Sequence, residues 1–175
     1  MQPHFKRIGL IGKAADRNVS VTLHALAAHL ETQQASILLD AGIADLFPDS
    51  DYPVMDRANL ANRCDLAIVV GGDGTLLNAS RSLAEHGIAV LGVNLGRLGF
   101  LVDISPDDLN DYLGSVLDGE FDEDRRFLLS ATVGDQPAQL AFNDVVLHKW
   151  NIARMIEFET WIDGHFVYTQ RSDGL

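Results

Sequence analysis

The sequence has little cysteine and little positive charge, and both shortages narrow the possible functions. Cys64 is the only cysteine among 175 residues, which excludes an internal disulfide and a multi-thiolate metal site and fits a reducing cytoplasm. Lysine and arginine total 13 against 25 aspartates and glutamates, and no basic run offers a stripe for the phosphates of a nucleic acid. We therefore expect neither a nucleic-acid partner nor an anionic membrane partner.

A long apolar run near the N-terminus is also missing. The stretch Ile8–Ile11 is far shorter than a signal-peptide core or a membrane span, so we expect a soluble, untargeted, cytoplasmic protein. His24 and His29 are five positions apart, the wrong spacing for two ligands on one helical face, so no metal-ligand set is assigned. The acidic stretch at residues 122–124 is interpreted as a solvated loop.

Strand and helix patterns alternate over the first hundred residues. Short apolar runs predict buried strands, and apolar residues at helical spacing predict helices between them. Such alternation is typical of a Rossmann-like parallel sheet, which we assign to an α/β domain at residues 1–102. The expected strands are 7–12, 36–40, 65–70 and 88–93, and the expected helices follow Ser20 as N-cap and cover 56–63 and 76–84, with a surface loop at 41–53.

The pattern changes near residue 100. After one helix beginning near Pro106, extended segments dominate, and Asp163-Gly164 is a dipeptide favoured in tight hairpin turns. We assign residues 103–175 to the beginning of a β-rich, β-sandwich-like C-terminal domain. Because about four strands with open edges make a poor free-standing module, we expect this domain to be incomplete and the chain to be a fragment. The expected extended segments are 126–133, 139–148, 155–163 and 166–170.

The strongest local signal is Gly71 to Thr75, with the sequence Gly-Gly-Asp-Gly-Thr, between a buried strand and a helix. A glycine-rich turn there lets backbone N–H groups approach an anion at the helix N-terminus. It is neither the P-loop pattern nor the dinucleotide fingerprint. Asp73 within such a loop repels phosphate unless it accepts a proton from an attacking hydroxyl or meets the phosphates through Mg²⁺, and both roles belong to phosphoryl transfer. The alternative is that Asp73 caps the following helix.

The Gly-Gly-Asp-Gly-Thr motif resembles the group formed by diacylglycerol kinases, sphingosine kinases, NAD kinases and 6-phosphofructokinases. Further segments are similar to NAD kinase specifically, in order and spacing, and the resemblance spans essentially the whole chain. These segments are Asn94–Leu101 (NLGRLGFL), Asn143–His148 (NDVVLH) and Arg171–Leu175 (RSDGL).

The resemblance implies an enzyme in which NAD lies between an α/β and a β-rich domain while ATP, with Mg²⁺ or another divalent cation, phosphorylates the 2'-hydroxyl of its adenosine ribose. It implies that Asp73 is the catalytic proton acceptor and that members form homodimers or homotetramers. No residue is assigned as a direct metal ligand. The implied substrate- and nucleotide-binding residues are Gly72, Asp73, Gly74, Asn143, Asp144, Arg154, Arg171 and Asp173.

Other interpretations remain open from the residues alone. Asn143 and Asp144 are also typical of a β-turn, and Arg171 of a solvated surface, while no tight motif anchors Arg154. A lipid or sugar kinase uses the same glycine loop. A non-catalytic nucleotide-binding module is a further possibility, because the family's chain continues past the residue matching Leu175 into a Gly-Ser-Thr segment of the same site. These 175 residues alone are therefore expected to show weak or no kinase activity.

Overall fold

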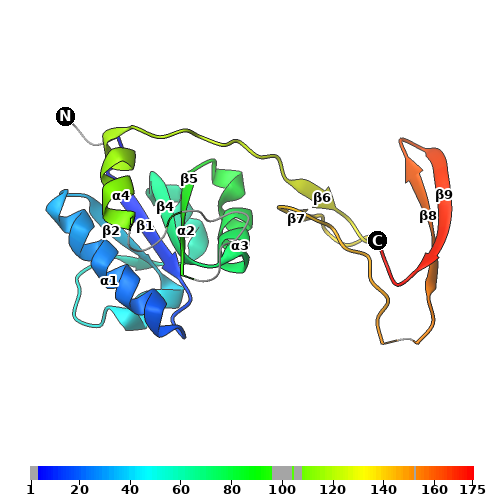
Figure 1. Ribbon diagram of the computed structural model, residues 1–175, viewed down its shortest axis with the longest axis horizontal. Coiled ribbons are helices and arrows are strands. Elements are labelled where there is room, and N and C mark those ends of the chain that lie inside the picture. The colour runs from blue at the N-terminus through cyan, green and yellow to red at the C-terminus, as the bar shows by residue number, and fades with distance from the viewer. Residues whose placement is uncertain (1–3, 96–103, 105–107, 152) are drawn as a thin grey trace. The chain divides into compact units, whose positions relative to one another are not determined.

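The computed structural model describes residues 4–95, 104, 108–151 and 153–175. The chain divides into two compact units, residues 1–126 and residues 127–175 (Figure 1). The first unit holds all the described helices and the parallel sheet, and the second holds two antiparallel hairpins. The predicted α/β domain followed by a β-rich segment is confirmed. Each unit is described by itself below.

The first unit is built on a five-stranded parallel sheet with the order β3-β2-β1-β4-β5. The four strands predicted from apolar runs are present within a residue of their expected bounds. The fifth strand, β3 at the edge of the sheet, was not predicted from the sequence, because it has only two residues. The strands are β1 (Arg7–Gly12), β2 (Ser36–Asp40), β3 (Val54–Met55), β4 (Leu66–Gly71) and β5 (Ala89–Asn94).

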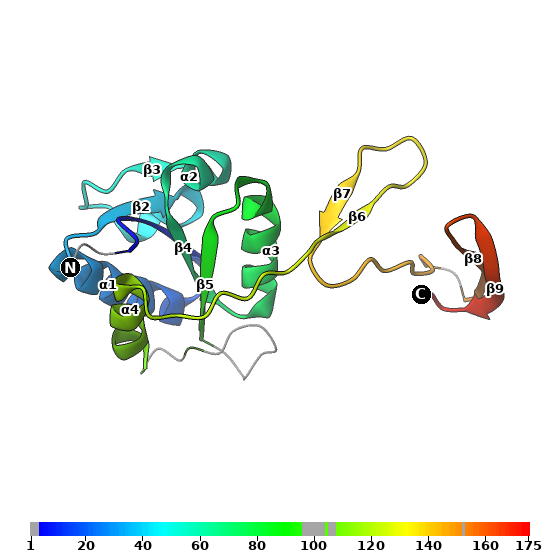
Figure 2. The ribbon, with the colours of Figure 1, turned by 90° about the horizontal axis from the view of Figure 1, so that it is seen from above.

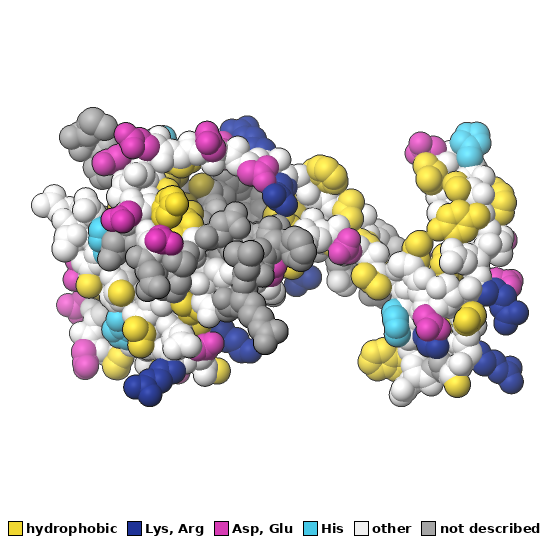
Figure 3. All heavy atoms as spheres, in the orientation of Figure 1, with side chains coloured by type: hydrophobic (Ala, Val, Ile, Leu, Met, Phe, Trp, Pro, Cys, Tyr) yellow, Lys and Arg dark blue, Asp and Glu magenta, His cyan; other side chains and the backbone are white. Residues whose placement is uncertain are grey.

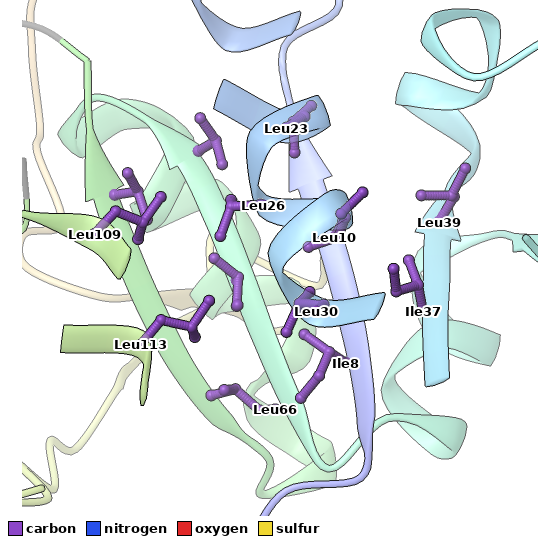
Figure 4. Close-up of a cluster of buried hydrophobic side chains, with 14 of the residues drawn as sticks. Ile8, Leu10, Leu23, Leu26, Leu30, Ile37, Leu39, Leu66, Leu109 and Leu113 are labelled. Atoms are coloured by element: carbon purple, nitrogen blue, oxygen red, sulfur yellow. The ribbon is translucent and has the colours of Figure 1, made fainter. Parts of the chain in front are cut away.

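Helices cover both faces of this sheet (Figure 2). On one face, α1 (Arg17–Thr32) and α4 (Leu109–Asp118) pack against β1, β2 and β4 through a continuous apolar cluster. Figure 4 shows Leu23, Leu26 and Leu30 of α1 in one buried cluster with Ile8 and Leu10 of β1. On the other face, α2 (Arg57–Arg63) and α3 (Asp73–Leu83) cover a smaller cluster. Burial on both faces explains why the central strands are apolar without alternation.

Two local expectations need correction. Helix α1 begins at Arg17, because the side chain of Asp16 accepts a hydrogen bond from Asn18 N at 2.9 Å and so caps the helix ahead of Ser20. Part of the expected loop at 41–53 is a 3-10 helix, η1 (Ala41–Leu46), whose first turn is capped by the Asp40 carboxylate. Helix α2 has Asp56 as its N-cap, and Gly87, with a left-handed φ of 63°, ends the helical segment that follows α3.

The boundary between the units falls after Arg126, later than the predicted boundary at residue 102. The reason is α4, whose Leu109 and Leu113 are buried in the same core as β1 and β4. Ile104 also forms a parallel bridge to Val93 of β5, and Asn94 N donates to Ile104 O at 2.8 Å. Residue 106, where this helix was expected to begin, and most of residues 94–101 lie outside the described residues.

The second unit consists of the hairpin β6 (Leu129–Ala131) with β7 (Gln139–Ala141) and the hairpin β8 (Ile156–Ile162) with β9 (His165–Ser172). Asp163 and Gly164 form the turn between β8 and β9 with φ values of 51° and 78°, as predicted. Strand β7 is much shorter than the extended segment expected at 139–148. None of the side chains described in this unit is buried, and apolar side chains such as Trp161 and Phe166 gather on the surface of the β8–β9 hairpin (Figure 3).

Candidate active site

The glycine loop connects the end of β4 to the beginning of α3. Gly71 is the last residue of β4, Gly72 is the N-cap of α3, and the half-buried Asp73 is its first residue. Thr75 N and Leu76 N donate to Gly72 O at 2.9 and 3.2 Å, which closes the first turn. Asp73 therefore does not occupy the N-cap position. It lies at the positive end of the helix dipole, where a negative charge is stabilised.

The glycines of this loop have different structural roles. A Cβ on Gly71 would lie 2.8 Å from Thr75 Oγ1 and 2.9 Å from Thr75 Cβ, so this position needs glycine for packing. At Gly72 and Gly74 an added Cβ meets no atom within 4 Å. The fold itself therefore gives no packing reason for these two glycines. Open space beside exposed backbone is what a bound phosphate group requires.

The loop lies at the point where the order of the sheet reverses. From β1 the chain crosses to β2 and then β3 on one side, and returns to β4 and β5 on the other. Gly12 at the end of β1 is in register with Val70, and Gly71 is in register with Asn94 at the end of β5. The carboxyl ends of β1, β4 and β5 therefore meet at one edge. In open α/β sheets, ligands bind at this edge and at this reversal of strand order.

Asp40, at the end of β2 and therefore at the same edge of the sheet, has its carboxylate bound by other residues of the fold. Asp40 is 6% exposed, and its Oδ1 accepts from Gly42 N at 3.0 Å. Its Oδ2 accepts from Arg57 Nε at 2.7 Å, so a cation balances the buried charge. In dinucleotide folds of the common type, a carboxylate following the second strand binds a ribose hydroxyl. Asp40 is committed to Gly42 and Arg57 instead.

The second unit brings two of the sequence motifs together. Leu147 N donates to Leu175 O and Leu175 N to Leu147 O, both at 2.8 Å, and Lys149 N donates to Asp173 O at 2.9 Å. The segments Asn143–His148 and Arg171–Leu175 thus pair through their backbones. Gly174 is required at this contact because a Cβ there would collide with Leu147 O. Asn143 and Asp144 are exposed and lie a few residues before Leu147, where the pairing begins.

The charged candidates of the second unit differ in how firmly they are held. Asp173 Oδ1 lies 2.6 Å from Lys149 Nζ, and this hydrogen bond lowers the pKa of the Asp173 carboxyl from its usual value. Arg171 is exposed, and its Nε lies 3.9 Å from Glu157 Oε2, a loose contact. Arg154 is exposed just before β8. Gly72, Asp73 and Gly74 belong to residues 1–126, and Asn143, Asp144, Arg154, Arg171 and Asp173 belong to residues 127–175.

One cation near the glycine loop was missed by the sequence analysis. Lys13 directly follows β1 at the same edge of the sheet and is exposed. A lone lysine forms no motif, so the sequence alone assigns it no role. The position of Lys13 near the loop can be recognised only when the strand order is known, because the pairing of β1 with β4 places Lys13 beside the Gly-Gly-Asp-Gly-Thr loop.

Within the described residues, no group of three histidine, cysteine, aspartate or glutamate side chains is arranged to hold a metal ion. Across the same part of the chain, no helix is both long and apolar enough to cross a membrane.

The profile of the ATP-NAD kinase N-terminal domain matches residues 13–121, which include the glycine loop and most of the parallel sheet. The chain belongs to this family. An NAD kinase of Chromohalobacter salexigens is 51% identical over 179 aligned positions, which cover all of this chain and 61% of the relative. One from Teredinibacter turnerae is 50% identical over 175 positions, with 98% and 60% covered. The chain thus spans about three fifths of the length of these relatives.

Solved structures of kinases share the fold. A yeast NADH kinase complexed with NADH superposes with a TM-score of 0.79 at 20% identity, over 97% of this chain and 56% of that one. An NAD kinase from Archaeoglobus fulgidus in complex with ATP gives a TM-score of 0.70 at 26% identity, over 96% of this chain and 58% of that one. Both cover the α/β unit and the hairpins. The fold of the family therefore extends beyond the part that the profile matches.

Proposed function

We propose that this protein phosphorylates NAD, transferring a phosphoryl group from ATP to the 2'-hydroxyl of the adenosine ribose to give NADP and ADP. The observation that carries the proposal is the half-buried carboxylate of Asp73, at the reversal of the strand order, between two glycines with open space beside them. Membership of the ATP-NAD kinase family supports the same reaction. Phosphoryl transfer depends mainly on positioning and on stabilising charge, which a glycine loop can supply through its N–H groups.

In the proposed reaction, Asp73 accepts the proton of the attacking ribose hydroxyl. The hydroxyl oxygen forms a bond to the γ-phosphorus, the bond between this phosphorus and its bridging oxygen breaks, and ADP leaves with that electron pair. Gly72 and Gly74 allow the loop to approach the nucleotide closely, because no side chain fills the adjoining space. Each of these groups acts at the carboxyl edge of the sheet.

Residues of the second unit are proposed to bind NAD. The exposed pair Asn143 and Asp144 offers an amide and a carboxylate, which together can recognise the donors and acceptors of a base edge and of ribose hydroxyls. Arg171 has only a loose contact with Glu157, so its guanidinium can form paired hydrogen bonds to a phosphate. Asp173 is held ionised by Lys149 and can accept from hydroxyl groups. Arg154 is proposed as a further contact.

A divalent cation, Mg²⁺ or another, is proposed to enter with ATP. Mg²⁺ usually keeps several waters and is held by one or two carboxylates together with substrate phosphates. The described residues fit this mode, because they offer Asp73 near the phosphate loop but no group of three ligands that would hold the ion alone. When bound, the cation neutralises charge on the transferred phosphoryl group.

A homodimer or homotetramer in the cytoplasm is proposed as the working form. The exposed apolar side chains of the β8–β9 hairpin, including Trp161 and Phe166, support self-association, and the reduced, buried Cys64 is compatible with a reducing compartment. Sedimentation equilibrium tests the assembly directly, and a strictly monomeric protein at micromolar concentration would contradict it.

The direct test is calorimetric titration of the 175-residue chain with NAD, with and without Mg-ATP, beside a coupled assay for NADP. Saturable NAD binding supports the assignment of the dinucleotide site to these residues, and NADP formation supports the reaction. A folded chain that binds no NAD would contradict that assignment. Phosphorylation of a lipid or sugar hydroxyl with indifference to NAD would replace the proposed reaction with that of a related kinase.

A further inference from the structure

The phosphate site proposed above needs positive charge, and the chain has little of it near the glycine loop. The formal net charge is -12, and the loop itself carries the carboxylate of Asp73. A nucleoside triphosphate has several negative charges, so it must meet a cation as well as backbone N–H groups at this edge of the sheet. The positions and ion-pair partners of the lysines and arginines in residues 1–126 indicate which of them can bind the phosphates.

Most described cations of the first unit are remote from the loop or already paired. Arg57 is engaged by the buried carboxylate of Asp40. The others lie at the opposite edge or beyond the sheet: Lys6 and Arg7 at the start of β1, Arg63 at the end of α2, Arg81 in the last turn of α3, and Arg125 and Arg126 in ion pairs with Glu123 and Asp124. Arg97 falls outside the described residues.

Lys13 and Arg17 remain among the described cations, and Lys13 is the better placed. Gly12 is in register with Val70 on the adjacent strand, so Lys13 follows directly beside Gly71 and the loop. Neighbouring strands are about 4.8 Å apart, a distance that an extended lysine side chain spans. Lys13 is exposed and makes no ion pair within the described part of the chain. Arg17 is set back in the first turn of α1.

We infer that Lys13 binds the phosphates of the donor triphosphate at the carboxyl edge of the sheet, beside the Gly-Gly-Asp-Gly-Thr loop. This inference rests on the proposed kinase function and adds to it a charged contact outside the glycine loop. Lysine suits such a site because its ammonium is a compact point charge with three donors on a flexible stem. The contact is to phosphate oxygens, so it is independent of the base and the ribose.

The test compares the wild-type chain with Lys13→Gln, Lys13→Arg and two matched controls. Arg17→Gln removes a charge from the neighbouring helix, and Arg63→Gln removes an exposed charge at the opposite edge. Affinities for Mg-ATP and for inorganic tripolyphosphate are measured by calorimetry at about 50 mM and about 300 mM salt, since screening weakens charge contacts. Thermal unfolding of each variant is compared with that of the wild-type chain, to check that the substitution leaves the fold intact.

A single charge-assisted contact predicts that Lys13→Gln weakens both ligands roughly 10- to 100-fold at low salt and less at high salt. Lys13→Arg should recover most of the affinity, and each control should stay within about threefold of wild type. Wild-type affinity in Lys13→Gln would overturn the inference and leave the proposed function standing. No binding of either ligand by the wild-type chain would also overturn it, and NADP formation by a protein of its relatives' full length that carries these residues would then judge the proposed function separately.

Discussion

Replacing Gly74 by alanine is expected to stabilise residues 1–126 while it weakens ligand binding. Gly74 is the second residue of α3, and an added Cβ meets no atom within 4 Å. Alanine loses less backbone freedom than glycine on folding, so the free energy of unfolding should rise by roughly 0.5–1 kcal/mol. The same methyl group fills space that the proposed nucleotide needs. Affinity for NAD or ATP should therefore fall at least about tenfold, ~1.4 kcal/mol.

The same substitution at Gly71 should have the opposite effect on stability. Its φ of 157° lies at the edge of the region that only glycine occupies readily, and the new Cβ would meet Thr75 at 2.8–2.9 Å. Backbone strain and overpacking each cost about 1–3 kcal/mol, so Gly71→Ala should lower the free energy of unfolding by roughly 2–6 kcal/mol. Adding Thr75→Ala removes two of the three crowded atoms and should restore part of this loss.

Urea unfolding followed by far-UV circular dichroism measures these changes, because all the described helices lie in residues 1–126. Calorimetric titration of the folded variants measures affinity. A destabilised Gly74→Ala, or a Gly71→Ala that unfolds like wild type, would refute the geometry assigned to the loop. A stabilised Gly74→Ala with unchanged affinity would remove Gly74 from the nucleotide site.

Two further predictions concern ionisable groups of the same unit. Hydrogen bonds from Arg7 lower the pKa of the Asp65 carboxyl from its usual value of 3.8, so this pair stabilises the fold above that pH, and its contribution is lost as the pH falls through the lowered pKa. The loss of stability caused by Arg7→Gln, measured by urea unfolding, should therefore be largest near neutral pH and vanish in acid. A difference in stability that does not change with pH would contradict this. Burial raises the pKa of the Cys64 thiol to about 11. At pH 8 a thiol reagent should therefore label Cys64 only as fast as residues 1–126 unfold locally or globally. Rapid labelling of the folded chain would contradict the burial of Cys64.

Local signals predicted much of the first unit because its strands are continuous apolar runs. They failed where two local signals compete or where an element is very short. Asp16 and Ser20 are both good N-caps, and only the hydrogen bond from Asn18 N to Asp16 decides between them. The two-residue strand β3 has no periodicity to detect. Its pairing with β2 is a tertiary property.

Non-local packing explains the other differences. The composition changes near residue 100, but α4 still belongs to the first core because Leu109 and Leu113 complete the layer beside α1. The pairing of Leu147 with Leu175 joins segments far apart in sequence, and no local pattern encodes it. The Gly-Gly-Asp-Gly-Thr loop was predictable because strand, loop and helix are consecutive. Lys13 was not, since its place beside the loop depends on the pairing of β1 with β4.

The most direct test of the proposed chemistry is the turnover of Asp73→Asn in a protein of its relatives' full length that carries these 175 residues. Asparagine keeps the size and hydrogen-bonding capacity of aspartate but cannot accept the hydroxyl proton. NADP formation should fall by roughly 10²–10⁴-fold while NAD still binds, and Asp111→Asn, an exposed aspartate in the first turn of α4, should leave turnover unchanged. Wild-type rates of NADP formation by Asp73→Asn would contradict the assignment of Asp73 as the proton acceptor.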